Sequence, residues 1–149
     1  FRPGAKFAQH ELQGVPLRIA IGPKDLENGT VELARRDTLT KEVVALESLV
    51  DKVVNLMTEI QNNIFSKALS FRNSHITKVN TLEEFKDVLK NKTGFISAHW
   101  DGTNETEAKI KEITKATIRC IPVDNIAEDG KCIYSGNPSK QRVLFAKAY

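Results

Sequence analysis

Apolar and polar residues alternate in two short segments near the start of the chain. The segment VPLRIAI (15–21) has an apolar residue at every second position, and VELA (31–34) repeats that spacing. A period of two is typical of half-buried β-strands. The Gly-Pro and Asn-Gly dipeptides between the segments are turn signals, so we expect the chain to double back there. The connecting loop would then expose Lys24, Asp25 and Glu27.

Two arginines end the second of these segments. Arg35 and Arg36 are adjacent in sequence, and successive side chains of a strand point to opposite faces of a sheet. At least one of them therefore has to face away from the core. We expect the loop and this strand end to form an exposed surface with charges of both signs.

From Thr40 to about Arg72 the spacing of apolar residues changes to three or four. This period predicts one long amphipathic helix, or two helices with a break. We expect its apolar stripe to pack against the sheet, and we favour this over a coiled-coil partner face. The stripe consists of Val43, Leu46, Val50, Val53, Met57, Ile60, Ile64 and Ala68.

A second unit is predicted after His75. Thr81 and Glu84 have the spacing of a capping box, which predicts a helix through about Asn91, and Asn104 with Glu107 predicts the start of another. Short apolar segments alternate with these helices. The predicted fold class is α/β (α+β), with a first domain over 1–75 and a two-layer βαβαββ domain over 76–149. The strands are expected at 76–80, 95–100, 117–122 and 143–148, with a short segment at 131–135 before the last of them.

The composition is that of an ordinary globular protein. The 149 residues are 40% hydrophobic and 28% charged, and the net charge is +3. No apolar run approaches the ~20 residues that span a bilayer, so we expect no membrane contact. Two cysteines are too few for a disulfide framework or a four-thiolate zinc site, and Cys120 is expected to be buried in an apolar strand. No catalytic or phosphate-loop motif is present, so we predict no catalytic residues and disfavour a free-standing enzyme.

Five segments together resemble one known family. VPLRIAIGPKDLENGTVELARRD is similar to the anticodon-binding domain of prolyl-tRNA synthetases of the archaeal/eukaryotic-like type. Segments similar to that family follow the same order along nearly the whole chain: RPGAKFAQHELQGVP, IFSKALSFRNSH, ATIRCIP and GNPSKQRVLFAKAY. The resemblance implies part of a mixed-sheet anticodon-binding domain with a long helix over 1–75. It also implies a C-terminal prolyl-tRNA synthetase domain over 76–149.

The resemblance also implies a function. The chain would contribute recognition of the tRNA(Pro) anticodon to an enzyme that ligates proline to tRNA(Pro) with ATP and Mg²⁺. Its own catalytic domain would lie outside this segment, and the intact enzyme would be a cytoplasmic homodimer. The carboxylates would accept hydrogen bonds from guanine, and the cations would contact bases or phosphates. The residues predicted to contact tRNA are Lys24, Asp25, Glu27, Arg35, Arg36 and Arg72.

Two alternatives to tRNA binding by these residues stay open. Arg36 with Asp37, and Lys24 with Glu27, could simply form surface ion pairs, which contribute little to stability. The chain as a whole could be a structural or protein-interaction module without direct RNA contact.

The resembling family often carries a four-cysteine zinc site, and this sequence departs from it at three positions. Asp101, Thr106 and Ser135 stand where cysteines would be, and only Cys132 is kept. One thiolate with a carboxylate and two hydroxyls does not make a structural zinc site, so we predict that zinc is absent. The terminal Tyr149 would pack near the catalytic domain in the resembling family.

Overall fold

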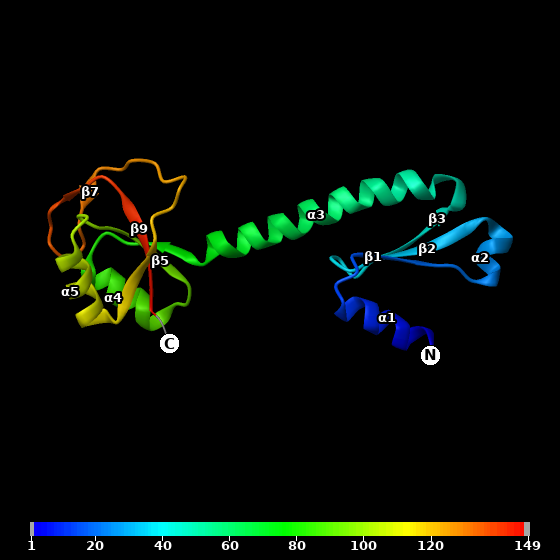
Figure 1. The fold of residues 1–149 in the computed structure, drawn as a ribbon, viewed down its shortest axis with the longest axis horizontal. Coiled ribbons are helices and arrows are strands. Elements are labelled where there is room, and N and C mark those ends of the chain that lie inside the picture. The colour runs from blue at the N-terminus through cyan, green and yellow to red at the C-terminus, as the bar shows by residue number, and fades with distance from the viewer. Residues whose placement is uncertain (1, 148–149) are drawn as a thin grey trace. The chain divides into compact units, whose positions relative to one another are not determined.

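The computed structural model describes residues 2–147 and divides into two compact units, Phe1–Leu69 (unit 1) and Ser70–Tyr149 (unit 2). The division falls within the longest helix, α3 (Leu49–Ser74) (Figure 1). Tyr149, which the resemblance expects to pack near the catalytic domain, lies outside the described residues.

Unit 1 is a three-stranded antiparallel sheet with helices. The strand order is β1-β2-β3, with Ile19 opposite Leu33 and Val31 opposite Val44. Val31 and Leu33 are fully buried against Leu56 of α3, so the alternating pattern does mark the core face. Before α3, the elements are α1 (Pro3–Leu12), β1 (Leu17–Ala20), α2 (Pro23–Asn28), β2 (Thr30–Arg35), β3 (Lys41–Ala45) and a 3₁₀ turn (Leu46–Ser48).

Two expectations for unit 1 were wrong. The loop between the first two strands is the short helix α2. The long helix begins at Leu49 rather than at Thr40, because the segment Lys41–Ala45 is a strand that pairs with β2. The β-branched pair Val43-Val44 suits a strand, and Val44 packs onto the core that β2 and α3 form.

The apolar stripe of α3 is only partly buried. Ile60 is 2% exposed, but Val50 is 73%, Met57 43% and Ile64 47% exposed, while Leu56, which was not part of the predicted stripe, is 2% exposed. The expectation that the whole stripe packs on the sheet was therefore wrong. A sheet of three strands covers only a narrow face of a helix, and Val50, Met57 and Ile64 lie about 40° to 120° around the helix from the buried Leu56 and Ile60.

One buried carboxylate ties the end of β2 to α3. Asp37 accepts hydrogen bonds from Arg35 Nε (3.1 Å), Arg35 Nη2 (2.9 Å) and Asn63 Nδ2 (2.6 Å), and its side chain is 1% exposed. The remaining Arg35 nitrogen, Nη1, is 2.9 Å from Glu59 Oε2, and Lys67 donates to the Asp37 carbonyl oxygen at 2.7 Å. The guanidinium of Arg35, with the amide of Asn63, lowers the pKa of Asp37 to about 2. The same pairing raises the pKa of Arg35.

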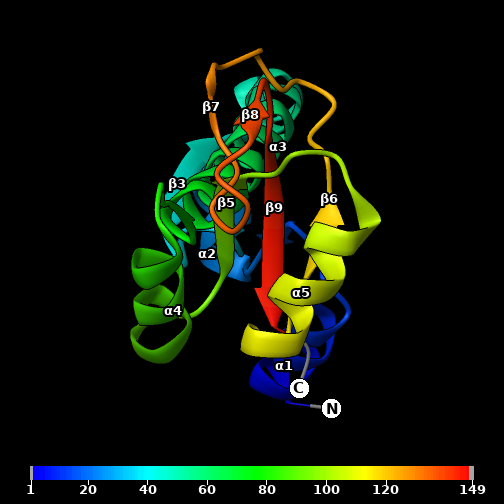
Figure 2. The ribbon, with the colours of Figure 1, turned by 90° about the vertical axis from the view of Figure 1, so that its left-hand side faces the viewer.

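Unit 2 is a two-layer α/β unit, as the sequence predicted. Its sheet has the order β4-β5-β9-β6, in which β4 and β5 are parallel and β9 is antiparallel to both neighbours. Figure 2 shows β9 between β5 and β6. The core joins both helices to one face of the sheet, and Phe85 of α4 meets Phe145 of β9 edge to face at 5.2 Å. The elements are β4 (Ile76–Lys78), α4 (Leu82–Asn91), β5 (Phe95–His99), α5 (Asn104–Thr114), β6 (Ala116–Cys120), β7 (Gly130–Lys131), β8 (Pro138–Ser139) and β9 (Arg142–Lys147).

The capping signals were right for one helix and one residue off for the other. Thr81 Oγ1 accepts from Glu84 N at 3.2 Å, and Glu84 Oε2 accepts from Thr81 N at 3.3 Å, which completes the predicted capping box of α4. Thr103 rather than Asn104 caps α5. Cys120 is exposed and not buried, because β6 is an edge strand with a register irregularity just before Cys120.

Replacing Asp37 is expected to destabilise unit 1. The Asp37→Asn variant loses two charge-assisted bonds from Arg35, so the free energy of unfolding should fall by about 1–3 kcal/mol at pH 7. The folded-state pKa of about 2 lies below the unfolded value of ~3.9. The contribution is therefore complete above roughly pH 4 to 5 and is lost as the pH falls towards 2.

Urea unfolding, monitored by far-UV circular dichroism, measures this effect. Trp100, the single tryptophan, lies in unit 2, so a change confined to unit 1 leaves its fluorescence transition in place. Glu32→Gln is the matched control, because it breaks only the partly exposed pair with Lys41. Equal losses in Asp37→Asn and Glu32→Gln would contradict the assigned role of Asp37.

Candidate nucleic-acid interface

The short helix α2 presents the predicted loop charges. Pro23 is its first residue, and Gly29 ends it with φ +64°, so the expected turn residues serve as helix start and stop. The Oδ2 atom of Asp25 accepts from Gly22 N at 2.8 Å and so fixes the first turn. Lys24 and Glu27 are exposed and, within residues 2–147, do not form the ion pair considered as an alternative.

The two arginines at the end of β2 have different roles. Arg35 faces α3 and is bound to Asp37 and Glu59, with 16% of its side chain exposed. Arg36 is exposed, and its Nε donates to the carbonyl oxygen of Glu11 at 2.9 Å. Asp37 pairs with Arg35, so the surface pair between Arg36 and Asp37 that was considered as an alternative does not form. The two terminal nitrogens of Arg36 have no partner among the described residues and can bind an incoming oxygen.

The predicted site residues do not converge on one point. The helix α2 precedes the six-residue strand β2, which ends at Arg35 and is followed by Arg36, so the length of the strand, roughly 20 Å, separates α2 from the arginines. Arg72 belongs to unit 2 and donates from Nε and Nη2 to its neighbour Asn73 Oδ1, at 3.1 and 3.0 Å.

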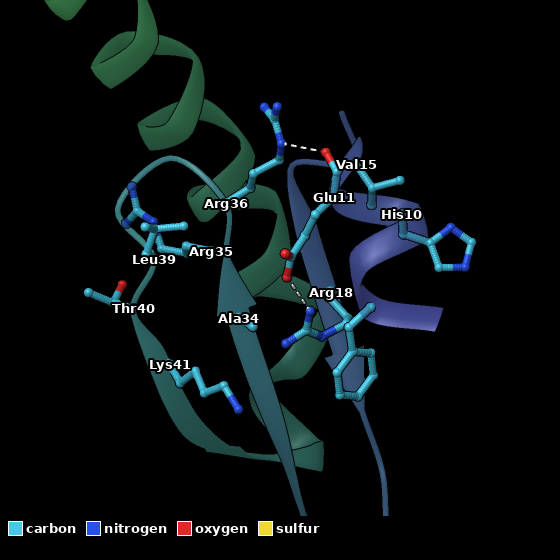
Figure 3. Close-up of a pocket in the computed structure, with 11 residues that line it drawn as sticks. His10, Glu11, Val15, Arg18, Ala34, Arg35, Arg36, Leu39, Thr40 and Lys41 are labelled. Carbon is cyan, nitrogen blue, oxygen red and sulfur yellow. Dashed lines mark hydrogen bonds and ion pairs between the residues drawn. The ribbon is translucent and has the colours of Figure 1, made fainter. Parts of the chain in front are cut away.

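A small pocket lies beside Arg36, between α1 and the face of the sheet opposite α3. Figure 3 shows Arg18 and Arg36 reaching towards Glu11 from β1 and from the end of β2. Arg18 Nη1 is 2.7 Å from Glu11 Oε1, and its guanidinium carbon is 3.8 Å from the centre of the Phe7 ring. The cavity measures about 240 Å³ and is lined by Phe7, His10, Glu11, Val15, Arg18, Ala34, Arg35, Arg36, Leu39, Thr40 and Lys41.

Arg18 is the residue of this pocket that sequence reasoning missed. Its Nε atom is buried and has no hydrogen-bond partner in the described part of the chain. Buried donors are normally paired, so this atom is available to an acceptor that enters the pocket. The signal was present in the strand LRIA, where Arg18 is the polar residue that points away from the core between Leu17 and Ile19.

Comparisons with known proteins match both units. Residues 2–56 match the family described as "Anticodon binding domain", and residues 82–149 match "Prolyl-tRNA synthetase, C-terminal". The chain belongs to the prolyl-tRNA synthetase family. It is 66% identical over 148 residues to a proline–tRNA ligase of Flavobacterium johnsoniae and 67% identical over 148 residues to one of Christiangramia forsetii. A proline–tRNA ligase of Porphyromonas gingivalis is 57% identical over 148 residues. Each match covers 99% of this chain and 30% of the relative, so the chain spans about 30% of the length of these relatives.

In the part matched to the prolyl-tRNA synthetase C-terminal family, a second carboxylate is saturated with hydrogen bonds. Asp101 Oδ2 accepts from Ser135 Oγ at 2.6 Å and from Thr106 Oγ1 at 2.9 Å, and Asp101 Oδ1 accepts from Thr103 Oγ1 at 2.9 Å. Burial opposes its ionisation, but the hydrogen bonds from Ser135, Thr103 and Thr106 outweigh burial and lower the pKa of Asp101 to about 2. Three of the four positions singled out for zinc are therefore in direct contact, and Cys132 is buried three residues before Ser135.

Metal-binding groups and membrane-spanning helices are both absent from the described residues. Between residues 2 and 147, no group of three or more His, Cys, Asp or Glu side chains is placed to hold a metal ion. No helix in that range is long and apolar enough to cross a bilayer.

The different roles of Arg35 and Arg36 are directly testable. Arg35→Gln should lower the free energy of unfolding of unit 1 by about 1–3 kcal/mol, because it leaves Asp37 buried with its main partner lost. Arg36→Gln should change it by less than ~0.5 kcal/mol, since an exposed side chain is replaced. Urea unfolding by circular dichroism compares the two variants, and equal destabilisation would show that Arg36 is structural as well.

Proposed function

We propose that this chain recognises the anticodon of tRNA(Pro) within a longer prolyl-tRNA synthetase. That enzyme would ligate proline to tRNA(Pro) with ATP and Mg²⁺, on a catalytic domain outside this segment. The match of residues 2–56 to an anticodon-binding family carries the proposal. The free charges of α2 and of Arg36, in that matched range, support it. We infer a cytoplasmic homodimer for the intact enzyme, on the family resemblance alone.

The proposed contacts follow from which charges are free. Glu27, and the Oδ1 oxygen of Asp25, can accept hydrogen bonds from the N1–H and amino group of a guanine, while Lys24 binds a phosphate. At the other end of β2, Arg36 contacts a base or phosphate through its two unpaired nitrogens. Arg35 serves as a positioning residue, because its guanidinium is held by Asp37 and Glu59.

Arg72 contributes a contact from unit 2. Its side chain is exposed and is held only by Asn73, so its charge stays open to a phosphate. The contact is proposed to be electrostatic and independent of the anticodon sequence.

Loss of the free charges should relax anticodon preference in the full-length enzyme. Glu27→Gln and Arg36→Gln should each lower kcat/KM for tRNA(Pro) by roughly 5- to 150-fold, because a base contact contributes about 1–3 kcal/mol of discrimination. The drop should be smaller for transcripts with altered anticodons. Charging assays with such transcripts measure both effects.

The control for these variants is Glu47→Gln, which removes an exposed charge of the same kind from the 3₁₀ turn before α3. An unchanged ratio between the natural and altered anticodons in Glu27→Gln and Arg36→Gln would favour the other candidate function. That candidate is a structural or protein-interaction module without direct RNA contact.

We further propose that unit 2 folds without structural zinc. Both oxygens of Asp101 are occupied by hydroxyl donors, and a carboxylate, two hydroxyls and one thiol are a poor donor set for this ion. The hydrogen bonds around Asp101 would hold together the segments that the metal joins in zinc-containing relatives of the resembling family.

A chelator should therefore leave unit 2 unaffected. The urea midpoint reported by Trp100 fluorescence should be the same with and without EDTA, because Trp100 adjoins Asp101 and reports this region. The triple variant Asp101→Cys, Thr106→Cys, Ser135→Cys has four cysteines at these positions and should bind about one zinc per chain, measured by elemental analysis. A chelator-dependent midpoint in the natural protein would disprove the proposal.

A further inference from the structure

Two exposed phenylalanine rings lie at one edge of unit 2. Phe71 is 66% and Phe95 39% exposed. Phe71 stacks on His75 with the ring centres 4.0 Å apart and the planes inclined by 29°. Phe95 N donates to the His75 carbonyl oxygen at 2.8 Å, so the backbone brings the two aromatic segments together.

The backbone contact beneath these rings depends on a glycine. Gly94 has φ +111°, and a Cβ there would lie 2.2 Å from the carbonyl oxygen of His75. The absence of a side chain lets the start of β5 approach the end of α3 closely. A cavity of about 450 Å³ results, lined by Phe71, Arg72, His75, Thr93, Gly94 and Phe95.

Cations surround the same cavity. An adjoining cavity shares Thr93, Gly94 and Phe95 with it, and Lys92 and Lys147 also line it. Arg119 lines it too, and donates only to the Ala146 carbonyl oxygen, at 3.5 Å. With Arg72, four cations lie around the two rings. Within residues 2–147, none of the four forms an ion pair with an acidic side chain.

The exposed rings and the cations without ion pairs together indicate the chemical class of the ligand. Exposed rings alone would suit any apolar partner, but four cations that form no ion pair within residues 2–147 favour a polyanion. A polyanion with flat apolar faces at regular intervals is a single-stranded nucleic acid, whose bases stack on aromatic rings while cations follow its phosphates.

We propose that this aromatic-basic surface (Phe71, Arg72, His75, Lys92, Phe95, Arg119 and Lys147) binds unpaired nucleotides of RNA. A base stacks on Phe95 or on the Phe71–His75 pair, and the cations hold the adjoining phosphates. The contact lies in unit 2 and does not read an anticodon. The surface shares Arg72 with the proposed function and adds base stacking on the rings of unit 2, and this stacking does not depend on anticodon recognition.

Binding of a labelled ten-nucleotide oligoadenylate to the full-length protein tests the proposal, with fluorescence anisotropy as the readout. Phe95→Leu keeps an apolar side chain but removes the aromatic face, so the Kd should rise by roughly fivefold or more. Phe95→Trp should restore binding to the natural level or better. Arg119→Gln should flatten the dependence of log K on log salt by about 0.7, the amount expected for one lost phosphate contact on a single strand.

The controls separate this surface from the other sites. Phe65→Ala removes an exposed ring from unit 1 and should leave the Kd unchanged. Lys52→Gln, which removes a unit 1 cation that is paired with Glu42 and belongs to neither proposed site, should leave it unchanged as well. Equal Kd values for Phe95→Leu and the natural protein would overturn the proposal. If Phe95→Leu instead lowered the stability of the full-length protein without changing RNA binding, the surface would be a contact between protein domains.

Discussion

The arrangement of unit 1 depends on the ion pair between Arg35 and the buried Asp37. A carboxylate that is 1% exposed is costly unless its oxygens are matched by donors, and here Arg35 and Asn63 supply them. The pair fastens the end of β2 to α3 through Asn63 and through Glu59. The pair also determines whether the neighbouring Arg36 has an acidic partner. Because Asp37 is fully engaged, Arg36 has no acidic partner there and keeps its charge free for a ligand.

Unit 2 contains a second saturated carboxylate with a comparable task. Asp101 links the start of α5 to the segment after Cys132 through Thr106 and Ser135. A metal would join such segments with a few strong bonds to thiolates, whereas here the same connection is spread over several hydrogen bonds that each contribute about 1 kcal/mol or somewhat more. Loss of one hydroxyl should therefore weaken unit 2 gradually, while loss of Asp101 removes every bond at once. In both units, an ionised carboxylate positions the chain around it.

Much of the fold was predictable from the sequence, and the failures have physical reasons. The burial of Val31 and Leu33 and the capping box at Thr81 depend on local pattern, so they were predicted correctly. The helix α2 was missed because Gly-Pro and Asn-Gly signal a turn and a short helix equally well. The strand β3 was missed because its pairing partner, β2, lies several residues away in sequence, and local spacing resembled a helix. The residues predicted to contact tRNA all carry charges, but only the structure separates Arg35, which is bound by Asp37, from Arg36, whose terminal nitrogens are free.

Which charged side chains are free follows from how many partners the fold gives each of them. Arg35 is bound by two acidic residues, and Arg142 by Glu128, Asn80 and two backbone carbonyls, so neither can turn towards a ligand without a loss of stability. An exposed ion pair would have added little stability to Lys24, Arg36 or Arg119. Leaving these three unpaired therefore costs the fold little and keeps positive charge available to phosphates. The free cations occur at α2, at the end of β2 and at the edge of the unit 2 sheet. The proposed RNA ligand would thus meet each of these free cations on a helix or strand, or directly after one.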